Sequence, residues 1–161
     1  MTGNISYEQA MIFVEQAFRA QSHGQLGEAI ELYQRSLEVH PTAEAHTYLG
    51  WAYSLLGRYD DAIEQCELAI VVDPEFGNPY NDIGAYLIEL GRWEEAVPWF
   101  EDAISAERYE APHFPHVNLG RTYEQLGRYR SALEEYNRAL AYAPLYRPAL
   151  DAKYTLIGRM Q

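Results

Sequence analysis

Three side chains that could bind a metal ion stand close together in this sequence of 161 residues. Glu110, His113 and His116 follow one another at intervals of three residues, and carboxylate and imidazole groups are common zinc ligands. The spacing matches known zinc motifs only loosely, and Pro112 and Pro115 favour a non-helical backbone at the entry to this segment. We therefore interpret the histidines as capping or packing residues and keep a metal-binding protein as a third alternative.

Other patterns that support catalysis are missing from the sequence. The glycines stand singly rather than in a phosphate-binding loop, and no Ser or Cys nucleophile has a base at a recognisable spacing. The single cysteine, Cys66, excludes an internal disulfide, and its position suggests a small buried apolar residue. The sequence thus predicts a protein that is not an enzyme and needs no cofactor.

The chain is acidic, with a formal net charge of −12. Such a charge repels phosphate backbones and anionic lipid, so nucleic acid and membrane surfaces are poor candidates for partners. The charge is uneven, because residues 60–110 carry fourteen acidic residues and two arginines, whereas residues 111–161 carry seven basic and four acidic ones. The acidic middle is either a solvated face or a surface that attracts a basic partner or another copy of the chain.

The N-terminal residues, 1–6, have neither the basic nor the apolar region of an export signal, and no apolar run approaches membrane-spanning length. We therefore expect a cytoplasmic protein without membrane insertion.

A repeated motif shows how the chain must position these residues. A Gly-Arg-aromatic turn recurs at Gly57-Arg58-Tyr59, Gly91-Arg92-Trp93 and Gly127-Arg128-Tyr129, with a degenerate copy at Gly24-Gln25-Leu26. Helical periodicity precedes and follows each turn, and Pro41, Pro74 and Pro144 close three of the units. The pattern predicts four helix-turn-helix repeats over about 10–42, 43–76, 77–112 and 113–146, then a capping helix over 147–161.

The repeating unit resembles the tetratricopeptide repeat. The resemblance rests on Leu49-Gly50-x-x-Tyr53, Leu119-Gly120-x-x-Tyr123 and the variant Ile83-Gly84-x-x-Leu87, each followed by the Gly turn and an Ala. It implies an all-α fold, a right-handed α-solenoid forming one domain over 1–161, in which Gly50, Gly84 and Gly120 let paired helices approach at Ala62, Ala96 and Ala132. The third unit departs from the pattern through a stretched connection around residues 106–112, without a closing Pro at the usual place.

The resemblance also implies a binding surface. In this family the first helices of successive repeats line a concave groove that holds a peptide or a partner's helix. Carried over by position, the groove residues are Phe18, Tyr48, Trp51, Asn78, Asn81, Asp82, Phe114, Asn118 and Arg121. Val14, Thr47 and Val117 are expected on the same face. The asparagines could hold an extended peptide's backbone, because an amide side chain both donates and accepts hydrogen bonds; alternatively they are ordinary residues of a solvated helix face.

One subclass of the family clamps the C-terminal carboxylate of heat-shock chaperones with Lys, Asn, Asn, Lys and Arg. The cation positions hold Val14, Asn78 and Asp82 in one frame, and Thr47, Phe114 and Asn118 in the other. Neither frame supplies the cations, so this clamp is not expected.

The leading hypothesis is therefore an adaptor or scaffold that binds a segment of another protein in the groove. The alternative is a homo-oligomer that assembles head to tail, with basic residues of one copy facing acidic residues of the next. The residues proposed for that contact are Arg128, Arg130 and Arg138 against Glu94, Glu95 and Glu101.

Overall fold

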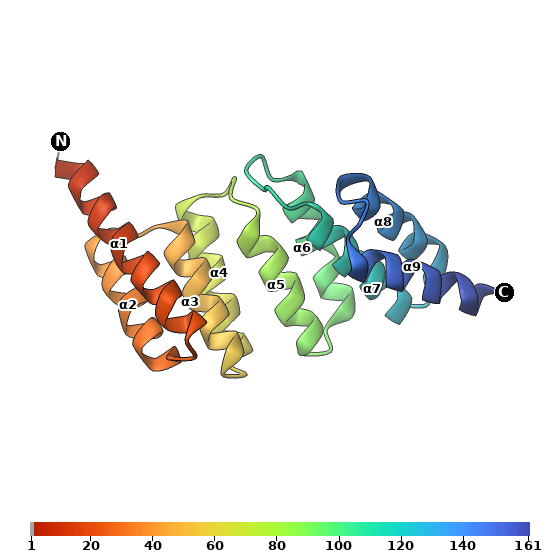
Figure 1. Cartoon of the computed structure of the whole chain (residues 1–161), viewed down its shortest axis with the longest axis horizontal. Coiled ribbons are helices and arrows are strands. Elements are labelled where there is room, and N and C mark those ends of the chain that lie inside the picture. Colours follow the sequence, from red (N-terminus) through yellow and green to blue (C-terminus); the bar gives the residue numbers. More distant parts are fainter. Residues whose placement is uncertain (1) are drawn as a thin grey trace.

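Helices account for nearly all of the chain in a computed structural model that describes residues 2–161, with side chains from Ile5 onward. The described part contains nine helices joined by short connections (Figure 1). They are α1 (Thr2–Ser22), α2 (Leu26–Val39), α3 (Ala43–Leu55), α4 (Tyr59–Val72), α5 (Asn78–Glu89), α6 (Trp93–Ser105), α7 (His113–Gln125), α8 (Tyr129–Tyr142) and α9 (Arg147–Met160).

The turn inside each pair depends on a glycine. Gly57 has φ +74°, a left-handed conformation that side chains disfavour. Its N–H donates to the Ser54 carbonyl at 2.9 Å, and the Arg58 N–H donates to the Tyr53 carbonyl at 3.0 Å, which satisfies the end of α3. The glycines at 24, 91 and 127 adopt nearly the same φ. The motif therefore ends one helix and starts the next.

Paired helices meet along a seam formed by small residues. A Cβ atom at Gly120 would lie 2.3 Å from the Tyr136 ring, and one at Gly84 would lie 2.5 Å from the Phe100 ring. At Gly50 the contact is the Ala62 carbonyl oxygen, at 2.9 Å. The expected close approach is thus confirmed, but at two of the three positions an aromatic ring, rather than the alanine, covers the glycine.

Successive pairs stack on one another (Figure 1). Three clusters of buried apolar residues follow the stack, and the partly buried Tyr53 and Tyr123 link each cluster to the next. Ala149 and Leu156 of α9 are buried against the side that holds Tyr136, so α9 covers the last pair as the capping helix was expected to. Cys66 is fully buried, and burial raises the pKa of its thiol. The all-α solenoid predicted from the repeats is confirmed.

One helix begins earlier than the repeat register suggested. α1 starts at Thr2, so the first pair extends beyond the expected boundary near residue 10. None of the helices in the described residues combines the length and the apolar character needed to cross a membrane.

Candidate peptide-binding groove

The nine residues predicted for the groove lie on four first helices of the pairs. α1 carries Phe18, α3 carries Tyr48 and Trp51, α5 carries Asn78, Asn81 and Asp82, and α7 carries Phe114, Asn118 and Arg121. None of the nine is buried. In contrast, Val14, Thr47 and Val117 are at most 5% exposed, so these three are not available to a ligand.

Aromatic rings gather at the N-terminal side of this surface. The Phe18 ring lies 6.0 Å from the Tyr48 ring and 6.2 Å from the Trp51 ring, centre to centre. Phe18 and Trp51 nevertheless remain 46% and 39% exposed. Large apolar side chains left open to water in one cluster are typical of a contact surface for a partner.

Phe114 is separate from that cluster. Its ring packs 4.3 Å from the His113 ring and 5.7 Å from the Tyr146 ring, at the junction of α7 and α9, and it stays 42% exposed. The structure therefore divides the predicted aromatic residues between the two ends of the groove.

Polar groups occupy the middle of the groove. The Asn118 side-chain amide of α7 donates to the Asn81 side-chain oxygen of α5 at 3.0 Å. Asp82 is half-buried beside Asn81, and burial raises its pKa to about 7, although a hydrogen bond from Asn81 opposes this rise. The two asparagines thus join neighbouring pairs and lead to a carboxyl group.

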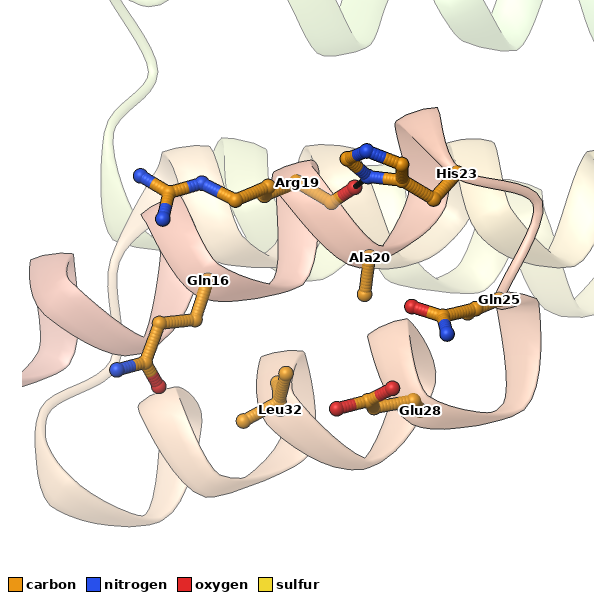
Figure 2. Close-up of a pocket in the computed structure, with 7 residues that line it drawn as sticks. All are labelled: Gln16, Arg19, Ala20, His23, Gln25, Glu28 and Leu32. Atoms are coloured by element: carbon orange, nitrogen blue, oxygen red, sulfur yellow. Dashed lines mark hydrogen bonds between the residues drawn. The ribbon is translucent and has the colours of Figure 1, made fainter.

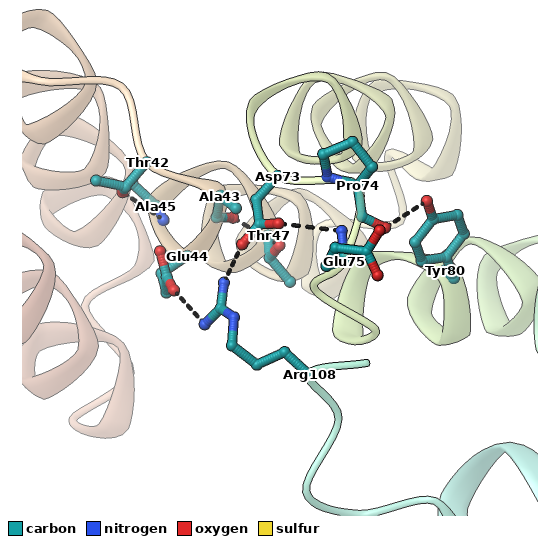
Figure 3. Close-up of polar contacts among 10 residues, drawn as sticks. All are labelled: Thr42, Ala43, Glu44, Ala45, Thr47, Asp73, Pro74, Glu75, Tyr80 and Arg108. Atoms are coloured by element: carbon teal, nitrogen blue, oxygen red, sulfur yellow. Dashed lines mark hydrogen bonds and ion pairs between the residues drawn. The ribbon is translucent and has the colours of Figure 1, made fainter. Parts of the chain in front are cut away.

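The stretched connection, residues 106–112, folds back along the edge of the groove; we call it the strap. The Arg108 N–H donates to the Glu75 carbonyl at 3.0 Å, and the Gly77 N–H donates to the Arg108 carbonyl at 3.0 Å. The Arg108 side chain pairs with Glu44 at 3.0 Å and with Asp73 (Figure 3). The strap therefore connects α3, the α4–α5 connection and the third pair.

A pocket of about 330 Å³ lies between α3, the start of α5 and the strap. Its lining residues are Glu44, Tyr48, Phe76, Asn78, Arg108, Tyr109, Glu110 and Ala111. The register placed Tyr48 and Asn78 in the groove, but not Arg108 or Tyr109. The stretched spacing of the third unit was the one signal in the sequence that pointed to this segment.

The opposite end of the groove is basic. Arg121 lines a pocket of about 450 Å³ between α7 and α9 together with Arg147, Asp151 and Arg159. Arg159 also forms an ion pair with Glu124. The residues of α9 were not predicted, because the capping helix was expected only to cover the end of the solenoid.

Another pocket, also of about 450 Å³, lies outside the groove, between α1 and α2 (Figure 2). Arg19, His23 and Glu28 project around it, and the His23 ring is already within 2.7 Å of the Arg19 carbonyl oxygen. No residue of α3 lines this hollow, so a ligand there would contact only the first pair.

Both histidines among the three candidate metal ligands have other contacts. His116 is buried, with its Nδ1 2.7 Å from a carboxylate oxygen of buried Glu135, whereas His113 packs on Phe114 and Tyr146. Within residues 5–161, no three His, Cys, Asp or Glu side chains gather in a way that could hold a metal ion. The packing interpretation of the histidines agrees with these contacts.

The charges considered for head-to-tail assembly are partly engaged within one chain. Arg128 lies 3.4 Å from Glu94, and Arg138 pairs with Glu135. Glu95 pairs with Arg92 of its own turn. These contacts use up part of the opposite charge that a second copy would need.

Similar proteins contain the same repeat. The small glutamine-rich tetratricopeptide repeat-containing protein 2 of Mycosarcoma maydis is 31% identical over 90 residues, which are 55% of this chain and 26% of that protein. The heat-shock protein cognate co-chaperone sgt12 of Aspergillus fumigatus is 29% identical over 89 residues, again 55% of this chain and 26% of that protein. The chain therefore spans about a quarter of the length of these relatives.

Solved structures share the fold. The structure of pilF from Pseudomonas aeruginosa superimposes with a TM-score of 0.90 at 20% identity, covering 96% of this chain and 70% of that one. Two family models, both described as tetratricopeptide repeat, match residues 14–81 and 75–144. The matches run through all four helix pairs. The chain belongs to the tetratricopeptide repeat family.

Proposed function

We propose that this protein is a non-enzymatic adaptor that binds an extended segment or a helix of a partner protein in the groove formed by α1, α3, α5 and α7. The exposed aromatic cluster of Phe18, Tyr48 and Trp51 carries the proposal, because burying such rings against a partner is favourable. The relative sgt12, which is named as a co-chaperone, supports a role in binding other proteins. A cytoplasmic location remains a prediction from the sequence.

The nine groove residues suit different parts of a ligand. Phe18 and Trp51 offer an apolar surface, and Asn81 and Asn118 offer amide groups that suit a peptide backbone. Their arrangement on rigid helices favours binding with little rearrangement of the groove.

Quantitative pull-down from the native host tests the groove. The variant Trp51→Ala plus Asn118→Ala removes one aromatic ring and one amide from it, and we expect it to lose most of the protein that the wild type retains. The matched control, Tyr129→Ala plus Asn137→Ala, removes the same kinds of group from the exposed surface of α8 and should retain the partner. Equal retention by both double variants would refute the groove as the binding surface.

A further inference from the structure

The middle and the C-terminal end of the groove differ in charge, and this difference bears on what the groove can hold. The middle, at α3 and α5, contains Glu44 and Asp82, whereas the α7–α9 end contains three arginines and one acid, Arg121, Arg147, Arg159 and Asp151. A bound segment therefore meets acidic groups in the middle of the groove and mainly basic groups at the α7–α9 end.

Asp82 is the acidic side chain among the nine predicted groove residues, and it lacks a counterion. Among the residues that the structure describes, no Lys, Arg or His lies within ion-pair distance of its carboxyl group. Its neighbours from other helices and from the strap include Tyr48, Cys66 and Tyr109. Burial raises the pKa values of these three groups, and the nearby charge of Asp82 raises them further. A half-buried carboxyl group in such surroundings is poorly solvated, so an incoming cation would be stabilised there.

The strap shows that this edge of the groove already attracts cations. Arg108 reaches across to Glu44, which lines the pocket beside the strap, and to Asp73 of the α4–α5 connection, and it pairs with both carboxylates (Figure 3). Asp82 is left without such a partner. The strap's arginine thus pairs with Glu44 and Asp73 and leaves Asp82 available to a ligand.

The polar contacts around Asp82 favour an extended ligand that lies across this residue. Asn118 donates to Asn81, which directly precedes Asp82 on α5, so the two amides lead from α7 to the carboxyl group. The exposed ring of Trp51 lies on the neighbouring helix α3. A lysine or arginine could lay its aliphatic stem along the aromatic surface and place its charge at Asp82.

We propose that the groove selects a partner segment with a lysine or arginine side chain bound at Asp82. This inference rests on the proposed function and adds the chemistry of the residue recognised. The arginines at the α7–α9 end repel a second cation, so the selected segment has one preferred basic position rather than general basic character.

Selection of random twelve-residue linear peptides displayed on phage tests the proposal. Peptides that bind the wild type should be enriched in Lys or Arg at one position, and Asp82→Asn should lose that enrichment. The matched control is Asp151→Asn, which makes the same change on α9, where the carboxyl group shares a pocket with three arginines; it should keep the enrichment.

A synthetic copy of one selected peptide then measures the contact. Replacing its basic residue by Gln should weaken binding to the wild type about tenfold, as expected for one partly buried charge pair, and should change binding to Asp82→Asn by less than twofold. Selected peptides without a basic position, or equal enrichment on Asp82→Asn, would overturn the inference while leaving the groove intact. Failure to select any peptide that depends on Trp51 would overturn the proposed function as well.

Discussion

The seam inside each helix pair and the groove that runs across the pairs depend on different kinds of residue. In the seam, Gly84 lies under Phe100 and Gly120 lies under Tyr136, with no room for another atom. In the groove, Trp51 and Phe114 remain exposed and pockets open between helices. The seam residues recur from repeat to repeat, whereas the groove residues vary. The repeated positions thus form the close packing between paired helices, and we propose that the variable ones recognise the partner.

The largest effect is expected in the seam. Gly120→Ala places a methyl group against the Tyr136 ring and strains the hydrogen bond from Tyr136 to Glu124. We expect the free energy of unfolding to fall by about 3 kcal/mol, as for an overpacked core. Gly27→Ala is the control, because nothing lies within 4 Å of the added atom; it should stabilise α2 by about 0.5 kcal/mol.

Urea denaturation followed by circular dichroism measures both variants. Surface substitutions ordinarily change the free energy of unfolding by no more than about 0.5 kcal/mol. A decrease this small in Gly120→Ala would contradict the close packing of Gly120 against the Tyr136 ring.

A smaller, pH-dependent effect is expected in the groove. The pKa of Asp82 is raised from 3.8 to about 7 by burial, so between these pH values the folded chain holds this proton more tightly than the unfolded chain. Asp82 therefore stabilises the fold at low pH, and this contribution is lost as the pH rises toward 7. The loss is on the order of 1 to 2 kcal/mol, since each pKa unit corresponds to about 1.4 kcal/mol and partial exposure reduces the effect.

Unfolding of the wild type and of Asp82→Asn at a series of pH values isolates this contribution. The neighbours from other elements, Tyr48, Cys66 and Tyr109, are uncharged across this range. The ordinary pKa values of tyrosine and cysteine already lie above it, and burial raises them further. The wild type should lose stability relative to the variant between pH 4 and 7. A difference that stays constant with pH would show that the groove does not bury this carboxyl group.

The same comparison explains what the sequence could predict. The turn at Gly57 and the helices around it follow from local signals. The register then placed Trp51, Asn81 and Asn118 on first helices of the pairs, and in the structure these side chains are not buried. Helix phase gives the side of a residue but not its depth, so the burial of Val14 was missed. The contact between Arg108 and Glu44 joins residues sixty-four apart in the sequence, and no local periodicity records it.

The smallest effect is expected where the strap meets the groove. Arg108→Ala removes two ion pairs and the contact of the guanidinium with the Phe76 ring, 4.5 Å from its centre. Because the Arg108 side chain is half exposed, the cost in unfolding free energy is only about 0.5 kcal/mol and should shrink at high salt. Arg92→Ala is the control, since Arg92 pairs only with Glu95 of its own turn among the described residues.

Hydrogen exchange shows whether the strap itself opens. The Gly77 N–H donates to the carbonyl of residue 108 and is protected while the strap is closed. In Arg108→Ala this amide should exchange faster, because the backbone hydrogen bonds alone hold the strap less firmly. Amides of the α7–α8 seam should keep their wild-type exchange rates. Unchanged protection at Gly77 would mean that Tyr109, whose side chain packs against Gly77, is sufficient to hold the strap. The arginine would then serve mainly to neutralise Glu44 and Asp73, and its removal should leave these two acids unpaired beside α3 and the start of α5.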